Sequence, residues 1–297
     1  MTTAFVLSGG GSLGAVQVGM LQALAQQGIA PDLLVGTSAG AVNAVWVAQH
    51  GMSADSLAGL SRIWTQLRRR DIFPVRPARV LRGLAGRAPA VSTSERLGEL
   101  VRNNCEIDDL CDATIPVHAL ATDLLSGQAA LISSGSPSEA VRASAAIPGV
   151  FPPVWRRGRW LIDGALSAPS GVHHAVHLGA TEVYVLPAGV PCALVEAPRS
   201  ALGVAVHSIS FLVQQRLIAD LENPLPGAMI HVLPPLCPVT VSAADFSHAD
   251  ELIGRARQAS SRWLDEGGPD LPRPARFLSL HDHADAGTPP RDRGLEV

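Results

Sequence analysis

The first forty residues alternate between short apolar runs and longer segments with helical periodicity. Residues 4–7 form an apolar run that ends in the glycine-rich segment 8–14, after which apolar residues recur every three or four positions as far as Gly28. A second apolar run, 33–36, is followed at once by a helical pattern that begins at Ala39. This pattern predicts two successive units, each made of a strand, a tight turn and a helix.

The remainder of the chain continues this alternation. Strands are predicted at 117–122, 129–132, 160–162, 182–186 and 229–233, and helices at 54–68, 171–178, 200–221 and 248–265. The segments 92–95 and 136–139 have capping-box spacing, so each is expected to open a helix. Alternating strands and helices predict an α/β fold, with a mainly parallel central sheet covered by helices on both faces.

Two segments interrupt the pattern. Residues 68–90 are rich in proline, arginine and glycine and predict a lid or loop within a single domain of residues 1–266. After Glu266 large apolar residues become scarce, so residues 267–297 are expected to form a flexible C-terminal tail. The lid region has a local basic excess, which suits either a surface that meets anionic lipid or a solvated loop; its arginines are Arg62, Arg68, Arg69, Arg70, Arg76, Arg79, Arg82 and Arg87.

Charge and composition exclude several classes of function. The 297 residues carry a net charge of −3 and no lysine, because all 23 basic residues are arginine. Nucleic-acid binding is disfavoured, as are Schiff-base chemistry, lysine-activated serines and P-loop phosphate binding. The N-terminus lacks the basic and apolar regions of a secretory signal, and no run approaches the roughly 18 apolar residues of a membrane span. We therefore expect a cytoplasmic protein with, at most, transient contact at a membrane surface.

The cysteines fit the same compartment. None of the four belongs to a C-x-x-C pair or to an even disulfide spacing, which is typical of buried thiols in a reducing environment. These residues are Cys105, Cys111, Cys192 and Cys237.

A candidate nucleophile lies in the second strand–helix turn. Ser38 is flanked by Gly36 and Gly40 in a Gly-x-Ser-x-Gly segment that follows an apolar strand and opens a helix. Such a turn projects the serine from a tight bend, and the glycines relieve crowding between neighbouring elements. The same context also suits a serine that merely caps the helix. In an α/β-hydrolase this turn follows several strands, whereas Ser38 follows only the second, so that topology is disfavoured.

The glycine-rich turn after the first strand is a candidate oxyanion hole. Backbone N–H groups of Gly9, Gly10, Gly11 and Gly14 can meet Ser38, because adjacent parallel strands bring their C-terminal loops together. The spacing also fits a dinucleotide-binding fingerprint, the basis of an alternative oxidoreductase function. That fingerprint requires an acidic residue at the end of the second strand, where this chain has Ser38.

A base for the serine is suggested by the strand at 160–162. Asp163 follows this strand directly and precedes Gly164, which places a carboxylate at the end of a strand beside a flexible turn. A purely structural role in capping the next turn is the alternative. Histidine is the commoner base, and six histidines lie downstream without a distinctive loop signature: His173, His174, His177, His207, His231 and His248. The first three are more typical of a helix surface or of packing than of a triad.

Five segments together resemble the patatin-like phospholipases. They are the glycine loop 9–14, the serine turn 36–40, the strand end 121–124, the segment 142–154 and the Asp-Gly-Ala motif 163–165. The resemblance implies a three-layer α/β/α fold and a Ser38–Asp163 dyad that works without histidine, metal or cofactor. It also implies hydrolysis of lipid acyl esters, of the phospholipase A or lysophospholipase kind, through an acyl-enzyme.

One difference from the family concerns the glycine loop. The family usually carries arginine or lysine where this chain has Leu13. A catalytically silent or acyl-transferring regulator with the same fold is therefore the alternative to a lipid hydrolase.

Overall fold

The computed structural model describes residues 1–74, 88–222, 227–270 and 278–279. Within these residues the strands form one eight-stranded sheet in the order β5-β6-β3-β2-β1-β7-β8, with β4 paired to β3. The strands are β1 Thr3–Leu7, β2 Leu33–Thr37, β3 Val117–Asp123, β4 Ala129–Ile132, β5 Val154–Arg156, β6 Arg159–Asp163, β7 Glu182–Leu186 and β8 Met229–Val232. The five strands β3, β2, β1, β7 and β8 run parallel, and β4, β5 and β6 add antiparallel pairs at one side.

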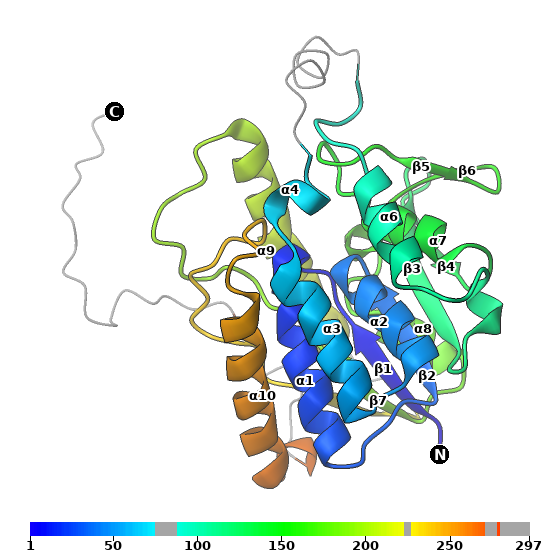
Figure 1. Ribbon diagram of the computed structural model, residues 1–297, viewed down its shortest axis with the longest axis vertical. Helices are drawn as coiled ribbons and strands as arrows, with labels where there is room; N and C mark the ends of the chain where they lie inside the picture. The colour runs from blue at the N-terminus through cyan, green and yellow to red at the C-terminus, as the bar shows by residue number, and fades with distance from the viewer. Residues whose placement is uncertain (75–87, 223–226, 271–277, 280–297) are drawn as a thin grey trace.

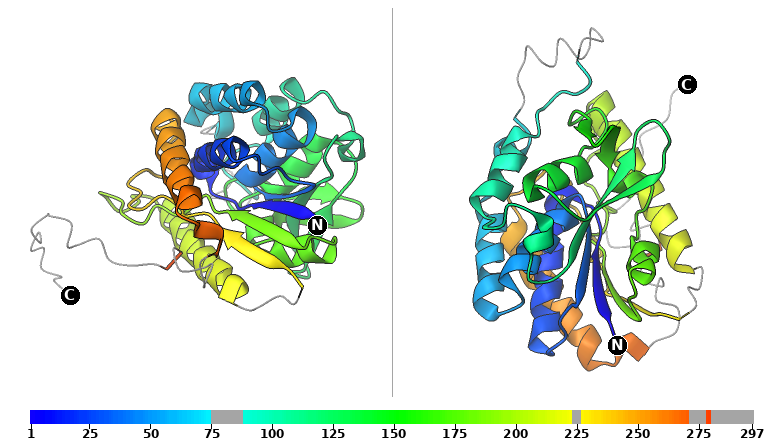
Figure 2. Two further views of the ribbon diagram at one scale, coloured as in Figure 1. Left: turned by 90° about the horizontal axis from the view of Figure 1, so that it is seen from below. Right: turned by 90° about the vertical axis from the view of Figure 1, so that its right-hand side faces the viewer.

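The helices occupy both faces of this sheet (Figures 1 and 2). They are α1 Gly14–Gln26, α2 Ala39–His50, α3 Ala54–Gln66, α4 Arg69–Ile72, α6 Glu95–Asn103, α7 Pro137–Ser144, α8 Val172–His177, α9 Ala201–Glu222 and α10 Ala249–Asp265. Short 3-10 turns lie at Gly11–Leu13, Leu110–Asp112, Gly164–Leu166 and Gly268–Asp270. The predicted α/β/α fold with a mainly parallel sheet is confirmed.

Alternate residues of each central strand enter two separate cores. In β1, Phe5 and Leu7 pack with α1, α2, α3 and α10, whereas Ala4 and Val6 pack on the other face with α8 and α9. Such alternation follows from the two-residue period of a strand, and it buries both faces of the sheet. The seven predicted strands all appear, and β5 is an additional short strand that the sequence pattern did not predict.

The two predicted capping boxes do not form, although a helix does begin at each segment. Helix α6 begins at Glu95 with Ser94 as its N-cap, two residues later than a box starting at Ser92 requires. Helix α7 begins at Pro137 as expected, but the Ser136 side chain makes no capping hydrogen bond. The spacing therefore located both helix starts and gave the wrong contacts.

Of the predicted lid at 68–90, the structure describes both ends. Residues 69–72 form the short helix α4, and Phe73 follows it. Residues 75–87 lie outside the described residues, as does most of the predicted tail at 267–297.

Candidate active site

Ser38 lies between β2 and α2 in a strained backbone conformation. Its φ of 54° and ψ of −119° lie in a region that residues other than glycine rarely adopt. Such strain is typical of functional sites, where the surrounding structure enforces it. The Ser38 N–H donates to the Oγ of Ser144 on α7 at 2.9 Å, and Ser38 itself is almost fully buried. Sequence reasoning did not identify Ser144, because only the fold brings α7 beside the serine turn.

The two glycines of the serine turn have no room for a side chain. A methyl group on Gly40 would lie 2.2 Å from the carbonyl oxygen of Leu7, at the end of β1. A methyl group on Gly36 would lie 2.6 Å from the Cα of Ala41. Both distances are far below van der Waals contact, so the close approach of β1, β2 and α2 requires glycine at both positions.

Asp163 ends β6 and meets the serine from the neighbouring part of the sheet. Its carboxyl is buried and lies close to the Ser38 side chain. The Ala165 N–H donates to Oδ1 at 2.9 Å, and the Asp163 N–H donates to the Ala146 carbonyl at 3.0 Å. Burial raises the pKa of the Asp163 carboxyl to about 6, although the Ala165 N–H and the nearby Ser38 side chain act to lower it.

The glycine loop passes directly over the serine. A methyl group on Gly9 would lie 3.1 Å from the Cβ of Ser38. Within the described residues, the N–H groups of Gly9, Gly10 and Gly11 donate no hydrogen bond. Three consecutive unpaired donors beside a hydroxyl are an arrangement suited to negative charge on a bound oxygen.

Gly14 has a different position from the other three glycines. It is the first residue of α1, and a methyl group there would lie 2.5 Å from the Trp64 ring and 2.8 Å from the Cβ of Ala39. Its role in the structure is therefore close packing of α1 against α2 and α3. Ala39, the first residue of α2, adds its N–H as a donor next to Ser38.

A distant segment, residues 238–247, braces the glycine loop. The Ser12 N–H donates to the Ala243 carbonyl at 2.8 Å, and the Ser12 hydroxyl donates to the Ser242 carbonyl at 3.1 Å. A methyl group on Gly11, whose φ is +59°, would collide with the same Ala243 carbonyl. The bracing segment therefore fixes the glycine loop at Gly11 and Ser12.

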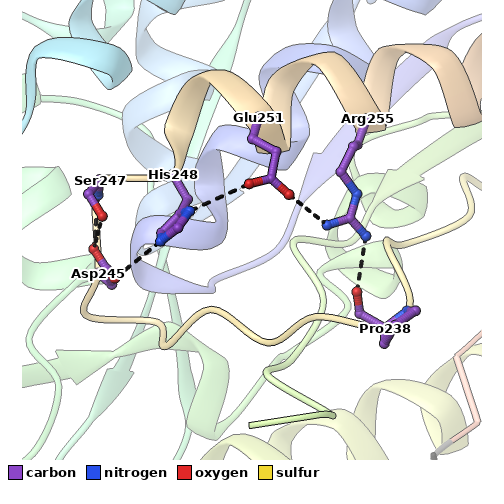
Figure 3. Close-up of polar contacts among 6 residues, drawn as sticks. All are labelled: Pro238, Asp245, Ser247, His248, Glu251 and Arg255. Carbon is purple, nitrogen blue, oxygen red and sulfur yellow. Dashed lines mark hydrogen bonds and ion pairs between the residues drawn. The ribbon is translucent and has the colours of Figure 1, made fainter. Parts of the chain in front are cut away.

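Polar side chains tie this bracing segment to α10 (Figure 3). Arg255 donates to the Pro238 carbonyl at 3.0 Å and pairs with Glu251 at 3.1 Å. His248 lies between Glu251 and Asp245, at 3.5 and 3.7 Å. The Asp245 carboxylate accepts from Ser247, and hydrogen bonds from Ser247 hold the pKa of Asp245 below its usual value. Both ends of the segment are thus attached to one helix.

A buried polar network supports the glycine loop from below. The Gln17 amide donates to the Ser8 and Leu186 carbonyls at 2.8 and 2.9 Å. The Asn43 amide donates to the Gly14 carbonyl at 3.0 Å and to Gln17 Oε1 at 2.9 Å. Trp64 Nε1 donates in turn to Asn43 Oδ1 at 2.8 Å. Since every bond is buried, the network holds both ends of the loop at fixed positions relative to α2.

An apolar pocket opens at Ser38. Its space, counted together with the open mouth, has a volume of about 510 Å³. Apart from Gly11 and Ser38 its walls are apolar or aromatic: Ala39, Val42, Ile63, Trp64, Leu67, Ile72, Phe73, Leu97, Leu100, Ala145, Ile147, Phe151 and Phe246. Ile72 and Phe73 come from the predicted lid segment. A pocket of this chemistry accommodates a hydrocarbon chain and offers almost nothing to a polar ligand.

The histidines form other contacts, none of them with Ser38 or Asp163 in the described part of the chain. His231 pairs with Glu182 at 3.1 Å, and His248 belongs to the bracing network. On α8, burial lowers the pKa of His174, whose Nδ1 has no partner, and His177 bonds to its own helix. Among the residues described, no group of three or more His, Cys, Asp or Glu side chains is placed to hold a metal ion.

Leu13 is fully buried in the core and does not line the pocket. The position at which the patatin-like family usually has a basic residue therefore contributes packing beneath the loop in this chain. The arginines of the described lid ends, Arg68, Arg69 and Arg70, are exposed, as is Arg62 on α3. The four remaining arginines of the lid region lie outside the described residues.

Comparison with known proteins gives a consistent assignment. A family model described as patatin-like phospholipase matches residues 5–176, more than half of the chain. An uncharacterized NTE family protein of Mycobacterium tuberculosis is 31% identical over 161 residues, which cover 54% of this chain and 26% of that protein.

Two relatives carry names that state an activity. The neuropathy target esterase of Drosophila melanogaster is 28% identical, covering 62% of this chain and 13% of its own length. A lysophospholipase of Aspergillus niger is 26% identical, covering 62% of this chain and 12% of its own. The chain thus spans well under half the length of the curated relatives it matches. Among solved structures, VipD from Legionella pneumophila aligns with 89% of this chain and 67% of its own, with a TM-score of 0.46 and 14% identity.

Proposed function

The chain belongs to the patatin-like phospholipase family, and on this basis we propose that it hydrolyses fatty-acyl esters of lipids through a Ser38–Asp163 dyad. The observation that carries the proposal is that the Ser38 side chain and the buried Asp163 carboxyl lie close enough for Ser38 to act on the pKa of Asp163, at an apolar pocket. A nucleophile beside a base whose pKa lies just below neutral pH is suited to general-base catalysis.

In the proposed mechanism, Asp163 accepts the proton of Ser38 as Oγ attacks the ester carbonyl carbon. Negative charge develops on the carbonyl oxygen, where the free N–H groups of the glycine loop and the N–H of Ala39 stabilise it. The tetrahedral intermediate collapses, the ester oxygen leaves with the proton from Asp163, and the acyl group stays on Ser38. Water then attacks this acyl-enzyme and gives a proton to Asp163. Asp163 returns this proton to Ser38 Oγ as the acyl–oxygen bond breaks, which releases the fatty acid and restores both side chains.

The pocket supports a lipid as the source of the ester. Its walls would remove a fatty-acyl chain from water, and each buried methylene contributes about 0.8 kcal/mol of binding. The family assignment and the absence of an acidic residue at the end of β2 both favour this function over dinucleotide binding. The names of the fly and fungal relatives, an esterase and a lysophospholipase, point in the same direction.

Covalent labelling tests the nucleophile. A fluorophosphonate should add to one serine, and the labelled peptide should contain Ser38. Ser38→Ala should abolish labelling, and both Ser38→Ala and Asp163→Asn should lower hydrolysis of a short-chain p-nitrophenyl ester by at least about a thousandfold. Ser61→Ala, which removes a hydroxyl from the surface of α3, is the matched control and should retain full activity.

Product analysis then separates the remaining alternatives. Incubation with phosphatidylcholine and with lysophosphatidylcholine should release free fatty acid in the absence of any other acceptor. A silent regulator would neither label nor hydrolyse, and an acyltransferase would label but require an alcohol acceptor for turnover. Either result would overturn the hydrolase proposal.

A further inference from the structure

Helix α9 has two halves with opposite environments. In its second half Gln214, Leu217 and Leu221 are buried against the sheet. In its first half, 201–213, no side chain is buried, and Leu212 is 69% exposed and Val204 49%. The first half of α9 therefore extends beyond the part of the sheet that the helix covers.

The exposed half of α9 is mostly apolar and carries no charged side chain. From Ala201 to Gln215 the helix contains no Asp, Glu, Arg or Lys, and its side chains include Phe211 and several leucine, isoleucine and valine residues. Of the described helices, only α9 is long and apolar enough to cross a membrane by length and composition, with 11% of that stretch buried. The sequence has no unbroken apolar run of that length, and α9 meets the threshold only by mean hydropathy, because its scattered Ser, His and Gln lower that mean little.

A full crossing does not fit the fold. The second half of α9 is part of the core, and the free half is about 20 Å long, shorter than the roughly 30 Å hydrocarbon layer. A mostly apolar helix without charges is stable where an apolar medium surrounds it, whereas a protein partner with a groove covers mainly one stripe of a helix. One leaflet of a lipid bilayer is such a medium, and the free half of α9 is long enough to enter it without crossing the bilayer.

The exposed half of α9 begins beside the acyl pocket. A methyl group on Gly149 would lie 3.0 Å from Leu202, and the loop around Gly149 supplies Ile147 and Phe151 to the pocket wall. Figures 1 and 2 show the first turns of α9 at the end of the molecule where the parallel strands terminate, and Ser38 follows one of these strands.

A second apolar group lies at the same edge of the sheet. Trp155 and Trp160 on the β5–β6 hairpin pack with tilted rings, whose centroids are 5.0 Å apart, and are 55% and 43% exposed. The Leu124 N–H bonds to the Trp160 carbonyl, and Leu125 beside it is 83% exposed. The hairpin also carries the exposed Arg157 and Arg159. Exposed tryptophan beside arginine is characteristic of protein segments that lie in the headgroup region of a bilayer.

We propose that the first half of α9 inserts into one leaflet of a lipid bilayer, with the Trp155–Trp160 hairpin resting in the headgroup region, so that the pocket at Ser38 opens toward the membrane. The proposed membrane contact rests on the proposed function in one respect, because it takes the bilayer as the source of the substrate. Binding itself does not require catalysis, and the two can be tested separately.

Flotation with vesicles of phosphatidylcholine and phosphatidylglycerol tests the surface. The full chain should float with the vesicles, and Val204→Glu/Leu212→Glu should weaken binding by about tenfold or more, because two charges would enter the apolar layer. The control Leu178→Glu/Met229→Glu changes charge equally at two exposed apolar residues on the opposite edge and should bind as the unaltered protein does. Trp155→Ala/Trp160→Ala should weaken binding by a smaller factor.

Three readings would overturn the proposal. They are failure of the unaltered chain to float, equal flotation of the α9 variant, and a concentration-dependent dimer in solution that the α9 variant abolishes. Both glutamate variants should keep the circular dichroism spectrum and the hydrolysis rate of a monomeric p-nitrophenyl ester. Failure of the unaltered chain to hydrolyse that ester would count against the proposed function. The flotation result would still test membrane binding, because binding does not depend on catalysis.

Discussion

The two edges of the parallel sheet are built on different principles. At the carboxyl edge, Ser38 has a strained backbone, the loop glycines have unpaired N–H groups, and Asp163 is buried with a raised pKa. At the amino edge, the Asp32 carboxylate accepts the Thr3 N–H at 2.8 Å, and Glu182 pairs with His231. One edge holds groups in unfavourable states, and the other satisfies its polar groups.

This difference locates the chemistry of the molecule. Strain, unpaired donors and a desolvated carboxyl each lower stability, so they persist only where the rest of the structure compensates for them. The compensation at the carboxyl edge is visible in the buried Gln17–Asn43–Trp64 network and in the bracing segment 238–247. The amino edge needs no such support, and substitutions there should affect stability alone.

The largest expected effect comes from crowding the carboxyl edge. Gly40→Ala places a methyl group 2.2 Å from the Leu7 carbonyl oxygen, with backbone atoms on both sides, so no side chain can move aside. We expect a loss of about 4 kcal/mol or more in the free energy of unfolding, measured by urea denaturation.

The matched control for this change is Gly254→Ala in α10. A methyl group there meets nothing within 4 Å, so this variant should be unchanged or slightly more stable. A folded, fully stable Gly40→Ala protein would contradict the tight packing of β1 against α2.

The next effect concerns the raised pKa of Asp163. The folded protein holds the Asp163 proton up to a pH of about 6, above the ordinary aspartate pKa of 3.8, so folding favours the protonated form and stability falls as pH rises between these values. Asp163→Asn removes this fall. At about pH 8 the variant should be more stable than the unaltered protein by up to about 3 kcal/mol, and at about pH 3 the two should be nearly equal.

The raised pKa of Asp163 also determines how catalytic activity falls at low pH. The kcat/KM for a soluble ester should decrease tenfold per pH unit below an apparent pKa of about 6, because protonated Asp163 cannot accept the Ser38 proton. A profile that is flat down to about pH 4 would exclude Asp163 as the base.

The smallest effect is expected at the amino edge. Glu182→Gln keeps a hydrogen-bond acceptor for His231 and Tyr184 and removes one partly exposed charge. We expect a loss of about 1 kcal/mol or less in thermal or urea denaturation and an unchanged kcat/KM. A clear decrease in kcat/KM with normal stability would show that the two edges are coupled.

Local patterns in the sequence predicted much of the fold. Apolar periodicity predicted the central strands and the main helices, because each of these elements buries a regular set of side chains. Strand β5 was missed because it has only three residues and none of them is buried. Ser92–Glu95 gave a capping pattern without the bond, because Ser94 lies closer to the first helical turn.

The site was predictable only where a motif carries it. Ser38 and the glycine loop follow the parallel strands β2 and β1, so their proximity could be inferred from topology. Asp163 ends β6, which runs antiparallel to β3, so its place beside Ser38 followed from the family resemblance and not from strand direction. Ser144 and Asn43 could not be found in this way, since each looks like an ordinary helical residue until the helices pack. Residues 200–221 were predicted as a helix, but the pattern could not show that the first half is exposed, because it cannot tell a buried apolar surface from an exposed one.

Trp64 links the length of the acyl pocket to the position of the glycine loop. Its ring forms a wall of the pocket, its Nε1 is the donor to Asn43, and its edge packs against Gly14. Shortening this residue to admit a longer chain would also release the support of the glycine loop. Changes of chain-length preference, whether by natural selection or by design, are therefore expected at wall residues whose side chains form no hydrogen bonds, such as Ile63 and Leu100.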